Sequence, residues 1–433
     1  MLIRAKTIPI NRDCFSLQNN LLISAILNYD CLMFKTLKKK DRILSSLAEK
    51  EVKRQKNTID LIASENIAPQ GVLELLGSEL TNKYSEGYPG KRYYPGNVYY
   101  DQIEELAKKR ALKIFRLSSR NWHVNVQAYS GAVANLAVYL SVLKPGETIL
   151  SMNLTAGGHL SHGSKVSFTG KLFNVVHYGV DKNYDIDYGE LEKLARKHKP
   201  KMIISGASAY PKKINFEKIG KIAKKVSAYH LADISHYAGL VSAGYYPYPF
   251  KFSDFVMTTT HKSLFGPRAA LIYISKNSSL AKKEKIDLPL LVDKAVFPGL
   301  QGGPHNNTIA AIAHGLWLTA KNKKYYRQVV RNAKVLCAEM KKMGFVVVGG
   351  KTESHLFLVN VLGLGMNGFE AEKMLEKEGI LANRNTVFGD ISPFKPSAIR
   401  IGTYAVTSKG MKEKDMKKLA KKIYNVLVVC RHG

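Results

Sequence analysis

The sequence predicts an α/β protein whose mostly parallel sheet carries helices on both faces and is followed by a smaller α+β domain. Three observations lead to this prediction. Short apolar segments alternate with longer amphipathic segments through the middle of the chain, as in parallel sheets covered by helices. After Tyr325 the order changes to helix, strand, strand and helix. The 433 residues exceed what one hydrophobic core usually accommodates, which favours two domains.

The first part of the chain is predicted to contain two helices separated by a loop. Apolar residues such as Leu44 and Leu47 recur at helical spacing and predict a helix over 41–56. A loop rich in glycine and tyrosine follows at 82–100, and a second helix is predicted over 101–115.

Six strands are predicted in the middle of the chain, each a short apolar segment bounded by polar or turn residues. They cover residues 147–152, 172–178, 201–204, 230–234, 254–259 and 269–274. Residues 216–229 place their apolar side chains on one helical face and predict a helix, and a longer helix is predicted over 308–319.

These elements divide the chain into four expected parts. Residues 1–40 lack clear periodicity and are interpreted as an N-terminal extension that is disordered or not native, with Met33 as the alternative start. A weak targeting segment is the competing interpretation, but no cleavage-site pattern follows the short apolar stretch. Residues 41–100 form a helical arm and a loop, residues 101–320 the large domain and residues 321–433 the small domain.

Composition narrows the class of protein. Hydrophobic residues make up 45% and charged residues 23%, which are ordinary globular values. No apolar run approaches the roughly 18 residues of a membrane-spanning helix. The four cysteines lack paired spacing, which argues against a disulfide framework and a zinc site. We therefore expect a globular protein of the reducing cytoplasm, without a membrane span or a bound metal.

The formal net charge of +32 is unusual for such a protein. A balance like this can indicate nucleic-acid binding. The lysines are spread along the chain, however, with only short runs at 38–40, 282–283 and within 417–422. A lysine-rich solvated surface is the favoured interpretation, and nucleic-acid binding stays open as the alternative.

One lysine stands in a position suited to covalent chemistry. Lys262 follows a predicted strand that ends in three threonines, and Arg268 lies shortly after it. A lysine that forms a Schiff base needs a rigid position and a depressed pKa, which burial and neighbouring positive charge provide. A solvated surface lysine is the ordinary alternative in a chain so rich in lysine.

Asp233 is the candidate partner of Lys262. It ends a predicted strand 29 residues before the lysine. A carboxylate at the end of an apolar strand is costly unless it pairs with a cation. In pyridoxal-phosphate enzymes, an aspartate keeps the pyridine nitrogen protonated. Ligands of open α/β sheets bind at the carboxyl ends of strands, where Asp233 and Lys262 can meet. A turn cap or a structural ion pair is the alternative.

Three further segments fit a bound anion or a flat ring. Ser130-Gly131-Ala132 precede an apolar helix, whose N-terminus can bind an anion. His159 follows two glycines, which let a ring approach a flat ligand closely. Arg400 lies between two isoleucines and needs a planar anion such as a carboxylate. A helix cap, a structural histidine and an internal salt bridge are the alternatives, but together the segments predict a pyridoxal-phosphate enzyme of amino acids.

Four longer motifs, which occur in order, make the chain resemble the serine hydroxymethyltransferase family. They are Leu61-Ile62-Ala63-Ser64-Glu65-Asn66, the NKYSEGYPGKRYY segment at 82–94, the segment from Thr258 to Arg268, and FPGLQGGP at 297–304. The resemblance covers the chain from Asp60 to its C-terminus.

The resemblance implies a fold, an activity and an assembly. The fold is that of fold-type-I pyridoxal-phosphate transferases, with a mostly parallel sheet of seven strands in the large domain. The activity is reversible transfer of the hydroxymethyl group of L-serine to tetrahydrofolate or a related reduced pterin, which gives glycine and 5,10-methylene-tetrahydrofolate. The assembly is a homodimer with shared active sites, to which the loop at 82–100 contributes.

The resemblance also implies the roles of single residues. Lys262 forms the Schiff base with the cofactor, and Glu86 is the acid/base group near the serine hydroxyl. The other implied catalytic residues are His159, Tyr94 and His261. Asp233 binds the pyridine nitrogen, while His159 stacks on the ring. The other implied cofactor contacts are Ser130, Gly131, Ala132, Ser208 and His236, with Tyr84, Gly302 and Gly303 reaching the site of the partner subunit.

The resemblance also implies which residues contact the substrates. Arg400 binds the carboxylate of the amino acid, and Ser64, Glu86 and Tyr94 complete that pocket. The implied pterin contacts are Leu154, Gly158, Leu160, Ser392, Pro393 and Phe394.

Two departures from the family pattern bear on cofactor affinity. Ala132 replaces a serine of the phosphate site, and Ser235 replaces an alanine between Asp233 and His236. The alternative enzyme is a pterin-independent aldolase of 3-hydroxy amino acids, and the Glu86 loop and residues 392–394 argue against it.

Overall fold

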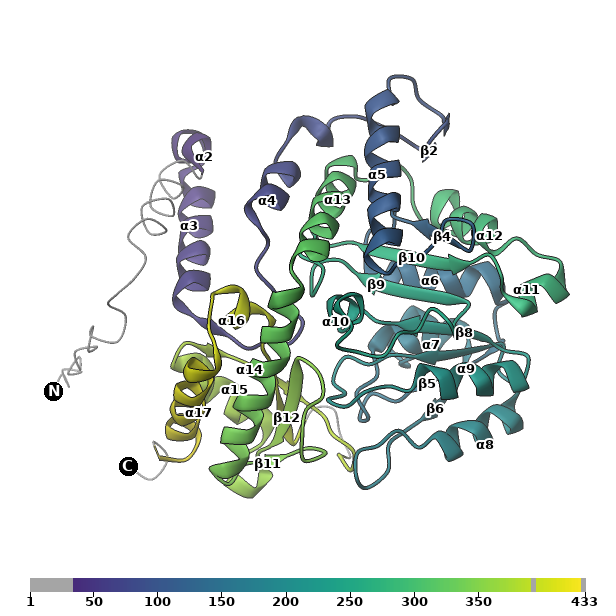
Figure 1. The fold of residues 1–433 in the computed structure, drawn as a ribbon. Helices are drawn as coiled ribbons and strands as arrows, with labels where there is room; N and C mark the ends of the chain where they lie inside the picture. The colour runs from purple at the N-terminus through teal and green to yellow at the C-terminus, as the bar shows by residue number, and fades with distance from the viewer. Residues whose placement is uncertain (1–33, 391–394, 430–433) are drawn as a thin grey trace. The chain divides into compact units, whose positions relative to one another are not determined.

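The computed structural model describes residues 34–390 and 395–429 (Figure 1). The chain divides into two compact units, Met1–Thr58 and Ile59–Gly433. In the first unit, α2 spans Lys35–Lys40 and α3 spans Arg42–Asn57, and the Asp41 side chain caps α3 by accepting a hydrogen bond from the Leu44 amide. The helix predicted over 41–56 is confirmed.

The second unit contains a seven-stranded sheet, which confirms the predicted fold class. Its strand order is β4-β10-β9-β8-β7-β5-β6. Strands β5 to β9 run parallel, whereas β10 is antiparallel to both β9 and β4. The strands are β4 Trp122–Asn125, β5 Thr148–Met152, β6 Asn174–Tyr178, β7 Met202–Ser205, β8 Tyr229–Asp233, β9 Phe255–Thr259 and β10 Ala270–Ser275.

One strand of this region was missed, and the bounds of two predicted elements need correction. Strand β4 was not predicted, because its four residues show too short a pattern. The strand predicted over 172–178 begins at Asn174, since Leu172 ends α7. The helix predicted over 216–229 ends at Lys225, because Ser227 adopts a left-handed φ of 54° that a helix cannot continue through.

Helices cover the sheet on two faces (Figure 1). Neighbouring residues of β8 show the two layers, because Leu231 and Ala232 belong to different buried apolar clusters. The helices of this region are α5 Val98–Ile114, α6 Gly131–Val142, α7 Phe168–Leu172, α8 Tyr188–His198, α9 Phe216–Lys225, α10 Ala238–Ala243, α11 Ser279–Glu284, α12 Leu288–Lys294 and α13 Asn306–Lys321.

A second, antiparallel sheet follows, in the order β11-β12-β15-β14. The predicted α+β character is confirmed, but there are more elements than helix, strand, strand and helix. They are α14 Lys323–Lys342, β11 Val346–Val347, β12 Leu356–Asn360, α15 Gly368–Lys377, β13 Ile380–Leu381, β14 Asn383–Asn385, β15 Ala398–Gly402, α16 Tyr404–Ser408 and α17 Glu413–Leu427. The domain boundary near residue 320 stays a prediction, since Leu358 and Tyr404 share a buried cluster with the large sheet.

The first part of the second unit, before α5, contains more structure than the predicted loop. Strand β1 (Ile59–Asp60) pairs in parallel with β13, and α4 spans Gln70–Leu76. Within the loop predicted at 82–100, β2 (Gly87–Tyr88) and β3 (Lys91–Arg92) form a hairpin, and α5 begins at Val98.

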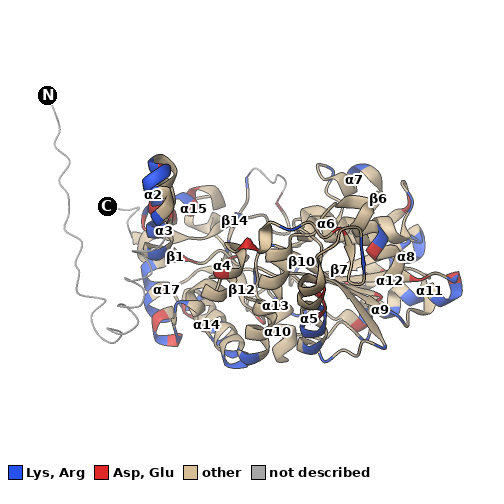
Figure 2. Ribbon diagram, turned by 90° about the horizontal axis from the view of Figure 1, so that it is seen from above, with Lys and Arg blue, Asp and Glu red and all other residues tan. Residues whose placement is uncertain are grey.

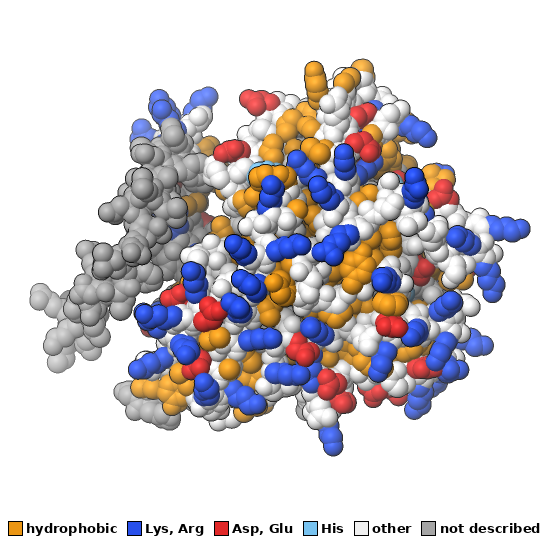
Figure 3. Space-filling view, viewed as in Figure 1, with side chains coloured by type: hydrophobic (Ala, Val, Ile, Leu, Met, Phe, Trp, Pro, Cys, Tyr) orange, Lys and Arg blue, Asp and Glu red, His pale blue; other side chains and the backbone are white. Residues whose placement is uncertain are grey.

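Charged side chains lie mainly on the outer helices and loops (Figure 2). On the face shown in Figure 3, lysines and arginines are scattered among acidic and apolar side chains. This distribution supports the interpretation of a lysine-rich solvated surface. Among the described residues, no helix is both long and apolar enough to cross a membrane.

Candidate active site

Asp233 and Lys262 meet at the carboxyl ends of neighbouring parallel strands. Asp233 is the last residue of β8, and Lys262 follows the end of β9, where its Nζ donates to Thr259 Oγ1 at 3.0 Å. Burial lowers the pKa of Lys262 to about 8, and Arg400 and Arg268 act in the same direction while Asp233 opposes them. The lysine therefore has the depressed pKa that a nucleophilic amine needs near neutral pH.

The Asp233 carboxylate is held in its charged form. Its Oδ2 lies 3.0 Å from His162 Nε2, and its Oδ1 accepts the Ser235 amide at 2.9 Å. Burial acts to raise the pKa of Asp233, but His162 and the Ser235 bond outweigh it and keep the pKa below its usual range. A buried anion at this place suits a cationic ring nitrogen.

His162 was not identified from the sequence. It ends the 3₁₀ turn Leu160–His162, and its Nδ1 lies 2.6 Å from the hydroxyl of the buried Tyr139. The ring thus connects Asp233 on one side to Tyr139 on the other. Its spacing of three residues from His159 is the only signal that the sequence offered.

His159 lies beside this network. Its Nδ1 is 2.8 Å from Ser161 Oγ, and although the residue is exposed, partial desolvation of the ring acts to lower its pKa. The glycines before it are also required for packing, and the close approach of a ligand stays a prediction. A Cβ on Gly158 would lie 2.2 Å from the Met152 carbonyl oxygen, so the glycine is needed for close backbone packing.

The Ser130-Gly131-Ala132 segment begins α6 next to the lysine. The Ser130 hydroxyl accepts from the Val133 amide at 3.4 Å as an N-cap. A Cβ on Gly131 would lie 2.7 Å from Thr259 Cγ2, so the N-terminus of α6 packs closely against the end of β9. The amides at the N-terminus of α6 and the Thr259 side chain, which can both donate hydrogen bonds to an anion, therefore lie close together.

Arg400 is a buried cation without a described carboxylate partner. From β15, its Nη1 donates to the Ser208 carbonyl at 2.6 Å and its Nε to Asn383 Oδ1 at 3.0 Å. Burial lowers its pKa to about 10. Among the described residues it forms no ion pair, which is an unfavourable state that a bound carboxylate relieves. Ser64 lies near this strand, since its neighbour Ala63 packs against Gly402.

A pair of buried imidazoles lies between the two sheets. His236 Nδ1 is 3.4 Å from Nε2 of His355, which the sequence did not single out, and His355 stacks on Tyr404 with ring centroids 4.2 Å apart. Burial, followed by Lys262 and Arg400, lowers the pKa of His236 well below its usual value. Burial likewise lowers the pKa of His261 to about 3. All these rings are neutral near pH 7.

The residues of the Glu86 loop form a second group. The rings of Tyr84 and Tyr94 lie 5.2 Å apart, and a Cβ on Gly302 would lie 3.3 Å from Glu86 Oε1. The Gly303 carbonyl accepts from the hydroxyl of Tyr129, which precedes the α6 segment. No contact within the described chain joins Glu86 to Lys262. Of the predicted pterin contacts, Leu154, Gly158 and Leu160 share the loop before His162, whereas residues 392–394 lie outside the described part of the chain.

The residues at the strand ends fit pyridoxal phosphate. Asp233 is a buried carboxylate for a protonated ring nitrogen, and Lys262 is a partly buried amine of lowered pKa. The N-terminus of α6 suits a phosphate, and the unpaired Arg400 suits a substrate carboxylate. Ala132 supplies no hydroxyl there, as the sequence indicated.

Comparisons with known proteins agree with this geometry. A family model described as "Serine hydroxymethyltransferase" matches residues 37–423. A serine hydroxymethyltransferase of Methanosarcina barkeri (strain Fusaro / DSM 804) is 52% identical over 388 residues, which cover 89% of this chain and 91% of that protein.

Proposed function

The chain belongs to the serine hydroxymethyltransferase family, and on that premise we propose how its described residues carry out the reaction. The enzyme moves the hydroxymethyl group of L-serine to a reduced pterin and leaves glycine. The observation that carries the assignment of residues is the convergence of three ionisable groups: Asp233 at the end of β8, Lys262 just after β9 and Arg400 in the middle of β15.

Pyridoxal phosphate supplies an electron sink for the negative charge that develops at the amino acid α-carbon. Lys262 holds it covalently, and Asp233 hydrogen-bonds its ring nitrogen. The uncharged side chains beside Lys262 and Asp233 suit contact with the aromatic ring of the cofactor. His159, His236 and Ser208 contact the ring, and the amides of Ser130, Gly131 and Ala132 bind the phosphate.

Arg400 orients the substrate. Its guanidinium is fixed by the Ser208 carbonyl and by Asn383, so its remaining N–H groups bind the serine carboxylate in one direction. Ser64 lies beside it. A fixed carboxylate fixes the bond that breaks at the α-carbon, which is the positioning that such a reaction requires.

Glu86 holds or moves the proton at the serine hydroxyl, with Tyr94 beside it. The pterin contacts Leu154, Gly158, Leu160 and residues 392–394. Tetrahydrofolate is the cosubstrate that we propose, and the cysteines without paired spacing support a cytoplasmic location.

We further propose a homodimer in which Tyr84, Glu86, Gly302 and Gly303 complete the site of the partner subunit. Around the Glu86 loop, aromatic and apolar side chains are unusually exposed, and Tyr99 is 77% exposed. The others that are more than half exposed are Tyr84, Tyr93 and Val98. Such an apolar surface suits burial against a second copy.

The direct test of the activity is to measure the rate at which glycine forms from L-serine with and without tetrahydrofolate. The proposal expects glycine to form rapidly only when the pterin is present. Equal rates with and without it would instead indicate a pterin-independent aldolase.

A further inference from the structure

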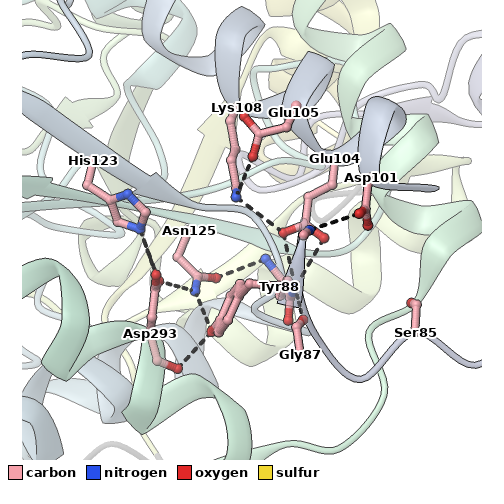
Figure 4. A network of polar contacts seen from close by, with 12 residues as sticks. Ser85, Gly87, Tyr88, Asp101, Glu104, Glu105, Lys108, His123, Asn125 and Asp293 are labelled. Atoms are coloured by element: carbon pink, nitrogen blue, oxygen red, sulfur yellow. Dashed lines mark hydrogen bonds and ion pairs between the residues drawn. The ribbon is translucent and has the colours of Figure 1, made fainter. Parts of the chain in front are cut away.

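The backbone around Glu86 is fixed on both sides by one side chain. Arg92 Nη1 donates to the carbonyl of Ser85 at 2.8 Å and to that of Gly87 at 2.7 Å. The Tyr93 amide donates to the carbonyl of Glu86 itself at 3.0 Å. Three successive carbonyls, centred on Glu86, are therefore held by two successive residues of the chain. Figure 4 shows the network of polar contacts around Gly87, Asp101 and Glu104.

Arg92 is itself fixed by two carboxylates of α5. Its Nε donates to Asp101 Oδ1 at 2.8 Å and its Nη2 to Glu104 Oε2 at 2.7 Å. The Arg92 side chain is only 5% exposed. Gln127 strengthens the arrangement, because its Nε2 donates both to the Gly87 carbonyl and to Glu104 at 3.0 Å.

The β2–β3 hairpin brings Arg92 opposite Gly87, its partner in register. Gly87 has a φ of 91°, and a Cβ there would lie 2.3 Å from the Lys91 carbonyl oxygen. Gly90, in the turn, donates its amide to Asp101 Oδ2 at 2.9 Å. The hairpin and the guanidinium are thus parts of one rigid unit attached to α5.

The Glu86 carboxylate contrasts with its backbone. Within the described residues it forms no hydrogen bond and no ion pair, although the carbonyls on either side are bonded. A backbone held from several directions next to an unengaged carboxylate is the arrangement expected of a side chain presented to a ligand.

We propose that Arg92 is a positioning residue for Glu86, which acts by aiming the carboxylate at the proton of the serine hydroxyl. This inference rests on the role of Glu86 proposed above. Only a guanidinium suits the task, because it contacts four acceptors in different directions, whereas the single ammonium nitrogen of lysine has three donors on one atom.

The test is a double-mutant cycle with Arg92→Lys, Glu86→Gln and the double variant, measured with L-serine and tetrahydrofolate. R92K keeps the positive charge for Asp101 and Glu104 but loses the planar guanidinium, whose N–H groups reach several acceptors at once. We expect R92K to lower kcat by about 10- to 100-fold with little change in the KM for serine, as a misaimed catalytic group does. In the E86Q background the same change should cost less than about twofold, because the group that Arg92 aims is gone.

The matched control is R110K. Arg110 is on α5, as are the Arg92 partners Asp101 and Glu104, and it donates to the backbone carbonyl of Ala313 at 2.9 Å, away from the loop. R110K should leave kcat within about twofold of wild type. Melting temperatures and bound pyridoxal phosphate are measured for every variant, so that lost folding is separated from lost positioning.

Where R92K fails to fold, Gln127→Met replaces it, since this variant keeps Arg92 and removes one donor to Gly87. We expect a smaller loss of kcat that again disappears in the E86Q background. The inference is overturned if R92K, or Q127M in its place, reduces kcat by the same factor in the wild-type and E86Q backgrounds, or if it keeps the wild-type kcat. If E86Q alone keeps the wild-type kcat, the proposed role of Glu86 fails first and this inference fails with it.

Discussion

Asp233 Oδ2 and His162 Nε2 lie 3.0 Å apart at the buried end of β8, and the Tyr139 hydroxyl lies 2.6 Å from the other nitrogen of the same ring. The histidine has two different partners, so its orientation is fixed. Its contact with Asp233 helps to keep the carboxylate charged in spite of burial. The charge on which the proposed cofactor site depends is therefore maintained by a residue that need not touch the cofactor.

Replacing His162 with leucine should weaken the binding of pyridoxal phosphate. The change removes a hydrogen bond to a buried anion, which lets burial raise the pKa of Asp233. Hydrogen bonds to charged groups contribute about 1.5–3 kcal/mol, so we expect affinity to fall roughly 10- to 100-fold. Titration of the apoprotein with the cofactor, followed by absorbance, measures this. His177→Leu on the exposed part of β6 is the control, and unchanged affinity in folded H162L would contradict the account.

The attachment of the cofactor should depend on pH through Lys262. Its pKa of about 8 means that the neutral amine increases as pH rises towards 8 and changes little well above it. Arg268 is one of the positive charges that lower this pKa, so Arg268→Gln should raise it and move the midpoint of the attachment rate to higher pH. Stopped-flow absorbance across a pH series gives both midpoints. A midpoint that stays in place or moves down would show that Arg268 does not act on the lysine.

Substitution of Arg400 by lysine should affect substrate binding more than folding. Lysine keeps a charge but cannot bind a carboxylate through two parallel N–H groups. We expect kcat/KM for serine to fall by about 100-fold, mainly through KM, while the melting temperature changes little because Arg400 has no described ion-pair partner to lose. Steady-state kinetics and thermal unfolding together decide this. A large loss of stability with an unchanged KM would assign Arg400 a structural role.

Mixing two inactive variants should restore activity if the sites are shared between subunits. Lys262→Ala removes the amine, and Glu86→Gln removes the proposed acid/base group. In a hybrid dimer one site combines the intact Lys262 of one chain with the intact Glu86 of the other. Random exchange then restores about a quarter of the wild-type activity. Subunits are mixed under mild denaturant and assayed after its removal, and no recovery in verified hybrids would place both residues in the same chain's site.

The sequence predicted the large sheet well because most of its strands are buried on both faces. Continuous apolar segments such as 230–234 and 254–259 differ clearly from amphipathic helices, and the parallel order follows from the alternation. Strand β4 was missed because four residues give too little pattern. The end of α9 was misplaced because the left-handed backbone of Ser227 has no sequence signal comparable to glycine.

Site residues could be predicted where the residue type and its neighbours in sequence are enough to indicate a chemical role. Asp233 and Lys262 stand at or just beyond strand ends, so the fold class alone brings them together, whereas Arg400 stands in the middle of β15. His162, His355 and Arg92 act through contacts between segments far apart in sequence or across a hairpin, and a single chain carries no mark of those contacts.

Borohydride reduction of the protein loaded with pyridoxal phosphate, followed by peptide mass spectrometry, tests the central claim most directly. Reduction makes the link between a lysine and the cofactor permanent, so the modified residue can be identified among the many lysines. The account predicts a pyridoxyl group on Lys262 and its absence in Lys262→Ala. A modification confined to another lysine, or no modification in cofactor-loaded wild-type protein, would contradict it.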